Sequence, residues 1–366
     1  MTERAWGPDA GVVIRRITNY YTVRFRGEDY VCLPRARLKK ERVAIHVGDR
    51  VLIEEIDLAN RTATVAEVLP RFNMLPRPPI ANVDQAVLVF AADRPAFNPM
   101  LLDRFLVLVA QSGIDSAIAI NKADLLDPEV LEALVAPYRA IGYPVVTVSA
   151  ERGDVEPLRA LLAGKETVFA GPSGVGKSSL LNALEPGLAL KAAEVSAKIQ
   201  RGRHTTTYAS LYALETAGET AYVADTPGYS HLGFGPLHPT QLGWLFPEMA
   251  PHIPDCRFPD CLHRGEPGCA VAERAQVAES RFASYLRFLE ELEATEERLA
   301  STSTKNEGAI KRKAAAGGGE TKLIRLAAGA RDDSRRKSKQ RLRDLHLEEP
   351  EDDEESDGQP DDQVLE

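Results

Sequence analysis

The sequence has few cysteines and no long apolar run. Only 4 of its 366 residues are Cys. No stretch approaches the roughly 20 consecutive apolar residues that span a bilayer, and the first residues, MTERAWGPDAG, contain no apolar segment of a secretory signal. These absences exclude a disulfide framework and a membrane-spanning helix. We therefore expect a soluble, cytoplasmic protein with no membrane partner.

The length and the distribution of charge indicate several parts. A chain of 366 residues with 44% hydrophobic residues can form two or three domains with full cores. The formal net charge is -9, but it is unevenly spread. Residues 1–80 carry 14 Lys and Arg against 10 Asp and Glu, residues 305–343 carry 13 against 4, and residues 344–366 carry none against 12. Local basic stretches of this kind favour a nucleic-acid partner in spite of the acidic total.

The first 70 residues read as short strands separated by turn residues. Five strands in about 60 residues are typical of a small barrel of the OB or SH3 kind. The excess of cations favours an RNA-binding barrel, although a five-stranded domain without a ligand fits the same pattern. The expected strands are Gly11–Ile17, Tyr20–Phe25, Tyr30–Leu33, Arg50–Glu55 and Thr62–Val68.

A proline-rich linker, 70–79, precedes a different pattern. Apolar runs alternate with stretches of helical period, which predicts a parallel sheet covered on both faces by helices. The runs are Gln85–Phe90, Ala117–Ile120, Val145–Val148, Thr167–Ala170 and Ala221–Ala224. The helical stretches are Pro99–Gln111, Pro128–Ile141, Val155–Ala163 and Lys177–Leu184.

A glycine-rich motif lies between an apolar run and a helix, and it matches G-x-x-x-x-G-K-[ST]. Its backbone N–H groups and the helix dipole can bind phosphates. Lys177 would reach the β- and γ-phosphates, and Ser178 would bind Mg²⁺. The residues expected to contact a nucleotide here are Gly171, Pro172, Ser173, Gly174, Val175, Gly176, Lys177, Ser178 and Ser179.

A second motif selects guanine. Asn121, Lys122, Ala123 and Asp124 have the form N-K-x-D and follow an apolar run. The Asp124 carboxylate can accept hydrogen bonds from guanine N1–H and its exocyclic amine, a pair of donors that adenine lacks. Asn121 can contact the base and tie this loop to the phosphate loop. Ser149 and Ala150 fit the backbone cap that lies over the base. The expected ligand is GTP or GDP.

A third motif, Asp225-Thr-Pro-Gly228, completes the phosphate site. Asp225 would hold Mg²⁺ through water, and the Gly228 N–H would face the γ-phosphate. A threonine of the preceding stretch, 201–207, should complete the Mg²⁺ shell, and we favour Thr206 over Thr205. Tyr229 stands where a water-orienting glutamine is common, so another group must position the water. His204 lies in the same loop and can hold a water or accept its proton.

The order of these motifs is unusual. In ordinary small GTPases the phosphate loop comes first and N-K-x-D later, whereas this chain has N-K-A-D, Ser149-Ala150, the phosphate loop and then D-T-P-G. The same sheet can form from a circularly permuted chain, because the termini of compact domains often lie close together. The segment after D-T-P-G then leads directly into the C-terminal residues.

A cysteine-rich loop follows. Cys256, Cys261, His263 and Cys269 supply three thiolates and one imidazole within 14 residues, which is a full tetrahedral set for one structural zinc ion. The loop lacks an obvious core, so the metal is expected to supply its folding energy. The fourth cysteine, Cys32, stands alone and is expected to be a small buried hydrophobe.

These motifs together resemble the small-ribosomal-subunit-dependent GTPases, the RsgA or YjeQ family, over about residues 11–300. The resemblance implies an OB barrel, a permuted P-loop GTPase domain and a zinc-binding domain. It also implies binding to the small ribosomal subunit and its rRNA, hydrolysis stimulated by that subunit, a role in its late maturation, and a catalytic role for His204. We expect a monomer with domains at 1–75, 76–235 and 236–300.

The remaining residues, 301–366, are polar and are expected to lack fixed structure. Two alternatives to a GTP-hydrolysing enzyme fit parts of the sequence. A nucleotide-dependent RNA-binding adaptor would scarcely turn over, but the intact Lys177, Ser178 and Asp225 favour the enzyme. A P-loop kinase would need an acceptor site and would have no use for N-K-A-D.

Overall fold

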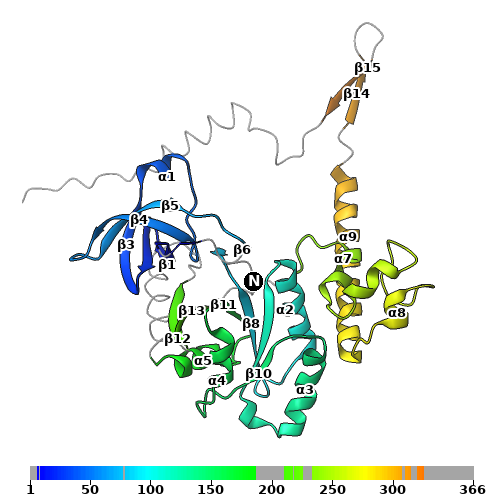
Figure 1. The fold of residues 1–366 in the computed structure, drawn as a ribbon. Helices are drawn as coiled ribbons and strands as arrows, with labels where there is room; N and C mark the ends of the chain where they lie inside the picture. The colour runs from blue at the N-terminus through cyan, green and yellow to red at the C-terminus, as the bar shows by residue number, and fades with distance from the viewer. Residues whose placement is uncertain are drawn as a thin grey trace, which may run out of the picture. The chain divides into compact units, whose positions relative to one another are not determined.

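A computed structural model of the chain describes residues 6–7, 9–76, 79–186, 210–216, 218–225, 233–306, 310–314 and 320–324 (Figure 1). Contacts between Cα atoms divide the chain into two units, Met1–Ala294 and Thr295–Glu366, and each is described by itself. Among the described residues, no helix combines the length and the apolar character needed to cross a membrane.

The N-terminal strands form the predicted barrel. It is closed in the order β1-β2-β3-β5-β4, with a short helix between the third and fourth strands, as in an OB fold. Inward-facing residues such as Val13, Val23 and Val65 are fully buried. Cys32 is buried among them as predicted, and burial raises the pKa of its thiol to about 11. The elements are β1 (Gly11–Ile17), β2 (Tyr20–Phe25), β3 (Glu28–Pro34), α1 (Ala36–Lys40), β4 (Arg50–Asp57) and β5 (Thr62–Val68).

The proline-rich linker is folded rather than extended. It contains a hairpin of β6 (Met74–Pro76) and β7 (Pro79–Ala81), in which Leu75 and Ile80 are buried. Pro76 and Pro79 are paired at the turn end of the hairpin, where a missing N–H costs least. The linker therefore positions the barrel through packed side chains.

The next region is a six-stranded sheet in the order β10-β9-β8-β11-β13-β12. Neighbouring strands are parallel except β12, an edge strand that was not predicted and that runs antiparallel to β13. The strands are β8 (Gln85–Ala91), β9 (Asp115–Asn121), β10 (Val145–Thr147), β11 (Glu166–Ala170), β12 (Leu211–Thr216) and β13 (Glu219–Asp225).

Both faces of this sheet are covered, as predicted (Figure 1). Along β8, Leu88 and Phe90 join one hydrophobic cluster, while Val87 and Val89 join the other. Leu102 and Val135 bring α2 (Pro99–Gln111) and α3 (Pro128–Ala140) to the first face. Leucines of α4 (Glu156–Leu162) and α5 (Lys177–Leu184) cover the second face. Successive side chains of β8 point into one core and then the other. Every position on the strand is therefore buried, and this is why its sequence is continuously apolar.

Strand β1 belongs to the barrel but also contacts the six-stranded sheet. Its register shifts between Val13 and Arg15, which is the mark of a bulge. Val13 packs in the barrel core, whereas Val12 and Ile14 belong to the cluster on the first face of the sheet. Arg15 also forms an antiparallel bridge with Ser210, the residue before β12. Strand β1 therefore contributes side chains to the barrel core and to the core on the first face of the sheet.

The C-terminal part of the first unit consists of four short helices and the first part of a long one, α9, around their own core. They are α7 (Pro239–Leu242), η2 (Gly243–Leu245), η3 (Ala250–Asp255), α8 (Ala270–Arg274) and α9 (Glu279–Asn306). Phe246, Tyr285 and Phe288 are fully buried in a cluster that also contains Cys261 and Cys269. The expectation that the cysteine loop lacks a core is therefore wrong, because aromatic residues distant in sequence supply one.

A buried ion-pair network fastens this part to α2. Arg281 of α9 is 2% exposed, and its Nη1 donates to Asp103 Oδ1 at 2.7 Å. Its Nε donates to Glu248 Oε1 at 2.6 Å. Burial raises the pKa of Asp103, and the guanidinium opposes that shift. Removing one member would leave an unpaired buried charge, which is strongly destabilising.

The polar tail is more regular than its composition indicates. Helix α9 continues to Asn306, and β14 (Ile310–Ala314) pairs antiparallel with β15 (Glu320–Ile324). The expectation of no fixed structure from residue 301 is therefore corrected for these residues. An argument from the composition of the whole tail cannot detect two strands of five residues.

Candidate functional site

The phosphate loop lies between β11 and α5, and two of its glycines are required by geometry. Gly171 has φ +144°, and a Cβ there would lie 2.1 Å from Val89 O. Gly176 has φ +92°, and a Cβ there would lie 2.4 Å from Asn121 Nδ2. Any side chain at either position would collide with these atoms or distort the loop. The motif glycines therefore let the loop pass close to β8 and to the N-K-A-D loop.

Side chains of the phosphate loop differ in their exposure and in their contacts. Lys177 Nζ donates to Gly171 O at 2.9 Å and to Pro172 O at 2.8 Å, so the amine lies over the loop. Ser178 and Ser179 are exposed in the first turn of α5, whereas Val175 is buried and anchors the loop. Ser173 and Gly174 are exposed at its tip. The exposed part of the loop thus carries the hydroxyls of Ser173, Ser178 and Ser179.

Asn121 joins three loops that are far apart in sequence. It ends β9, is 1% exposed, and its Nδ2 donates to Val175 O at 2.9 Å. Its Oδ1 accepts from Ala150 N at 3.1 Å. Lys122, which follows it with φ +58°, donates from Nζ to Gly174 O at 2.9 Å. The predicted tie between N-K-A-D and the phosphate loop is present, and it extends to the cap at Ala150.

The side chain of Ser149 stabilises the ionised form of Asp124. From the sequence, Ser149 was predicted only as part of the backbone cap over the base. Ser149 Oγ donates to Asp124 Oδ1 at 2.6 Å, and this hydrogen bond lowers the pKa of Asp124. Ala123 N donates to Val148 O at 3.1 Å, which fixes the loop against β10. An ionised carboxylate in a fixed position can accept the paired donors of guanine. The sequence contains a signal for this contact, because Ser149 is a hydroxyl residue directly after the apolar run that follows N-K-A-D.

The Mg²⁺ ligands are only partly within the described residues. Asp225 ends β13 and pairs in register with Phe169 of β11, so its backbone lies beside the start of the phosphate loop. The side chain of Asp225, and all of His204, Thr206, Gly228 and Tyr229, lie outside the described residues. Carboxyl ends of parallel strands meet at one edge of the sheet, where α/β proteins bind their ligands. The N-K-A-D, phosphate-loop and D-T-P-G motifs all begin at that edge.

The predicted metal ligands come together. One donor atom from each of Cys256, Cys261, His263 and Cys269 lies within 4.8 Å of the others. His263 Nδ1 lies 3.6 Å from both Cys256 Sγ and Cys269 Sγ. A tetrahedral ion with bonds of about 2.0–2.3 Å places its ligand atoms about 3.5–3.8 Å apart. The donor set and its spacing fit a metal ion of this kind.

The protonation of the cluster also fits a metal. Burial lowers the pKa of His263, which keeps the ring neutral and able to ligate. Burial raises the pKa of the Cys261 thiol to about 12, so its thiolate needs a compensating cation. Ala272 N also donates to Cys269 Sγ at 3.4 Å, which orients that sulfur.

Known proteins are similar to this chain in sequence. A sequence model for the family described as "RsgA GTPase" matches residues 68–235. The "Small ribosomal subunit biogenesis GTPase RsgA" of Microcystis aeruginosa is 41% identical over 324 residues, which cover 87% of this chain and 88% of the relative. The protein of that name from Alkaliphilus metalliredigens is 41% identical over 286 residues, covering 77% and 97%. The chain belongs to the RsgA GTPase family.

Solved structures agree with this assignment. The crystal structure of YjeQ from Thermotoga maritima matches with a TM-score of 0.66 at 35% identity, covering 78% of this chain and 98% of that one. YloQ, described as a circularly permuted GTPase, matches with a TM-score of 0.63 at 36% identity, covering 78% and 95%. The motif order of this RsgA-family chain is therefore a circular permutation within a conventional GTPase sheet.

Proposed function

We propose that the chain is a GTP hydrolase that acts in the late maturation of the small ribosomal subunit, with hydrolysis stimulated by that subunit. The observation that carries the proposal is the position of Asn121, whose amide binds both the phosphate loop and the base cap. This side chain assembles a guanine site and a phosphate site into one nucleotide site. The relatives named small ribosomal subunit biogenesis GTPases supply the subunit as the partner.

Within this site the roles follow from chemistry. Lys177 neutralises the β- and γ-phosphates, and the Gly228 N–H binds the γ-phosphate. Mg²⁺ accompanies GTP and is held by Ser178, Thr206 and, through water, Asp225. Asn121, Asp124 and the Ser149–Ala150 cap bind guanine. Mg²⁺ supplies charge neutralisation at the phosphates when it is bound.

The Cys256, Cys261, His263 and Cys269 cluster holds one structural zinc ion in our proposal. Four protein ligands leave no open position for substrate, which supports a structural role. The ion stabilises the junction between η3, α8 and α9, because Cys261 and Cys269 are buried in the core formed there.

The proposed partner contacts divide along the chain. The barrel and the basic stretch 305–343 supply contacts to rRNA, while residues 76–235 bind nucleotide and residues 236–300 carry the metal. The protein acts as a cytoplasmic monomer. Such contacts are electrostatic, so binding to the subunit weakens steeply as salt is raised.

Catalysis is proposed to use His204. The glutamine position is occupied by Tyr229, so the water needs another group, and a histidine of the 201–207 stretch has a suitable pKa. The test is phosphate release from GTP with and without small subunits. His204→Ala should keep GTP affinity and subunit binding but lose roughly a hundredfold of the stimulated rate.

A matched control is His252→Ala, which removes a histidine from η3 and should leave the stimulated rate within twofold of wild type. If His204→Ala retains the stimulated rate within a few-fold, catalysis belongs to another group, such as rRNA itself. If wild type binds GTP and releases no phosphate even with subunits, the chain is a nucleotide-dependent adaptor.

A further inference from the structure

The barrel carries a run of cations on its one helix and the turn after it. Between Arg35 and Arg42 the sequence has five cations and a single carboxylate, Glu41. Helix α1 is anchored by Leu38, which is 4% exposed and packs in the barrel core. Lys39 and Lys40 at the end of α1, and Arg42 in the turn after it, are exposed. We call these three residues the α1 surface.

Cations on the strands of the barrel, exposed or half-exposed, differ in one respect, since they have carboxylate partners. Among the strands and their loops these pairs are Arg24–Asp29 at 2.7 Å, Arg26–Asp9 at 2.9 Å, and Arg61 with Glu28. The α1 surface has no ion pair with any carboxylate that the structure describes. Its charge is therefore available to an external anion, whereas the strand cations are already neutralised.

The half-buried cations of the barrel are not alternatives. Arg16 donates through Nη1 to Ile45 O at 3.3 Å and lies against the Tyr21 ring. Arg50 forms a buried ion pair with Glu166. Both hold the barrel together or fasten it to the sheet, so neither can turn toward a ligand without breaking a buried contact.

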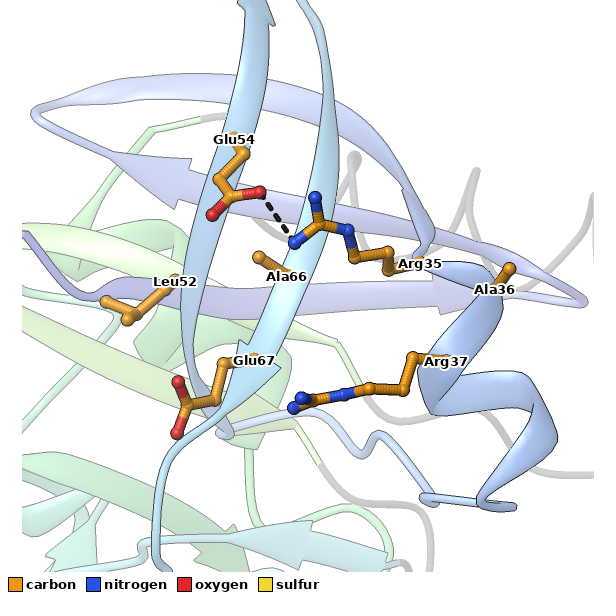
Figure 2. A pocket seen from close by; sticks show the side chains of 7 residues that line it. All are labelled: Arg35, Ala36, Arg37, Leu52, Glu54, Ala66 and Glu67. Atoms are coloured by element: carbon orange, nitrogen blue, oxygen red, sulfur yellow. Dashed lines mark ion pairs between the residues drawn. The ribbon is translucent and has the colours of Figure 1, made fainter.

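Arg35 and Arg37, at the start of α1, line a hollow of about 450 Å³ against β4 and β5 (Figure 2). Arg35 pairs with Glu54 at 3.0 Å, and Glu67 lies across the hollow from Arg37. Two guanidinium groups and two carboxylates make this hollow close to neutral. The positive excess of the helix therefore lies in the α1 surface and not in the hollow.

We propose that the α1 surface is where the barrel binds the phosphates of rRNA, and that the outer faces of its strands are not. The proposal rests on the proposed function, because it takes the small subunit as the partner. Exposed lysines and arginines without local partners release counterions from a polyanion when they bind it. Paired cations gain less, since each must first leave its carboxylate.

The effect of salt measures this contact. Each phosphate contact contributes about 0.7–0.9 to the slope of log affinity against log salt. Loss of three contacts therefore lowers the slope by about 2, so that between 50 and 200 mM salt the wild type loses roughly 16-fold more affinity than the variant.

The test uses the full chain and purified small subunits. One variant carries Lys39→Gln, Lys40→Gln and Arg42→Asn; asparagine is chosen because Arg42 has φ +54°, a region that asparagine tolerates. The matched control carries Arg24→Gln, Arg26→Asn and Arg61→Asn, which removes the same charge from the same barrel; Arg26 and Arg61 have φ +52° and take asparagine for the same reason. A third variant, Lys39→Arg with Lys40→Arg, keeps the charge. Equal melting temperatures and equal GTP hydrolysis without subunits confirm that all three are folded.

We expect the slope to fall by about 2 in the first variant, by less than half of that in the control, and not at all in the charge-preserving variant. Equal slopes in the first variant and the control would overturn the proposal, because net charge alone would explain both. Weaker binding at every salt concentration with an unchanged slope would also overturn it, since the contact would then be with protein. If the wild type does not bind subunits at all, the proposed function is wrong, and the proposal that the α1 surface binds rRNA is wrong with it.

Discussion

The nucleotide site and the metal cluster are assembled in opposite ways. In the nucleotide site, Asn121 and Val175 are 54 residues apart in sequence and are joined by a hydrogen bond. Asn121 ends β9, and Val175 lies in the phosphate loop. The metal cluster takes its four ligands from 14 consecutive residues among short helices. In the first site the sheet holds the parts in place. In the second, a small aromatic core surrounds the ligands, and the proposed zinc ion would neutralise their thiolates.

This difference separates function from folding. A substitution in the nucleotide site should change binding or rate and leave the fold intact, because the sheet does not depend on the nucleotide. A substitution in the metal cluster should disorder its surroundings and leave nucleotide binding intact. Four variants test that contrast.

The largest effect is expected for Cys261→Ala. Structural zinc contributes on the order of 10 kcal/mol to small metal-dependent folds, and three remaining ligands bind it poorly. Elemental analysis should show about one zinc per wild-type chain and almost none in the variant. GTP affinity should stay within about twofold. The control is Cys32→Ala in the barrel core, which should keep the metal; a metal-loaded Cys261→Ala would show that the cluster is not a four-ligand site.

Next is Lys177→Ala, which removes the amine that lies over the phosphate loop. Loss of one preorganised cation at the transferred phosphoryl group should lower GTP hydrolysis by about a thousandfold. The melting temperature should change by less than about 5 °C. Lys165→Ala, at the other end of β11, is the matched control and should retain activity. Equal hydrolysis by Lys177→Ala and wild type would place the active site elsewhere.

Asp124→Asn should lower GTP affinity by about a hundredfold, because it replaces charge-assisted hydrogen bonds to guanine. Affinity for xanthosine triphosphate should rise, since the new amide can donate to the xanthine carbonyl. Competition between the two nucleotides measures the change. Asp127→Asn, three residues further on at the start of α3, should bind both as wild type does. An unchanged preference for GTP in the Asp124 variant contradicts the guanine assignment.

The smallest effect is expected for Ser149→Ala. It removes one hydrogen bond to Asp124, worth about 1 kcal/mol, so GTP affinity should fall about fivefold. As the pH is lowered, the variant should lose GTP affinity at a higher pH than the wild type does. The reason is that Ser149 lowers the pKa of Asp124, and the carboxylate must be ionised to accept from guanine. A pH titration of GTP binding tests this, with Ser116→Ala on β9 as control; identical titrations would assign Ser149 to the backbone cap alone.

The same two regions show what a sequence can predict. The bounds of β1, β2, β5, α2 and α5 were predicted to the residue, because each has a clear period and a turn or cap at its ends. The motif residues were predicted because their chemistry fixes both residue type and spacing. The four metal ligands come together for the same reason.

What escaped prediction depends on contacts between distant segments. The Arg281–Asp103 ion pair joins residues 178 apart, and neither has a motif around it. The hairpin of β6 and β7 was predicted as a linker because its prolines are typical of a linker. The two apolar residues that are buried there, Leu75 and Ile80, show no period. The sequence of β12, LYALET, has only a weak alternation of apolar and polar residues. Its pairing with β13 shows that it is a strand. A short helix such as α1 is likewise fixed by the barrel and not by its own propensity.

The contribution of β1 to two cores has a consequence for how the chain is made. Arg15 leaves the ribosome 195 residues before its bridge partner Ser210, and Leu211 and Ala224, which belong to the cluster of Val12 and Ile14, come later still. At 5–20 residues per second the interval is roughly 10–40 s. Throughout that time the nascent barrel carries an apolar edge without its final cover. The barrel is thus synthesised well before the residues that complete its packing.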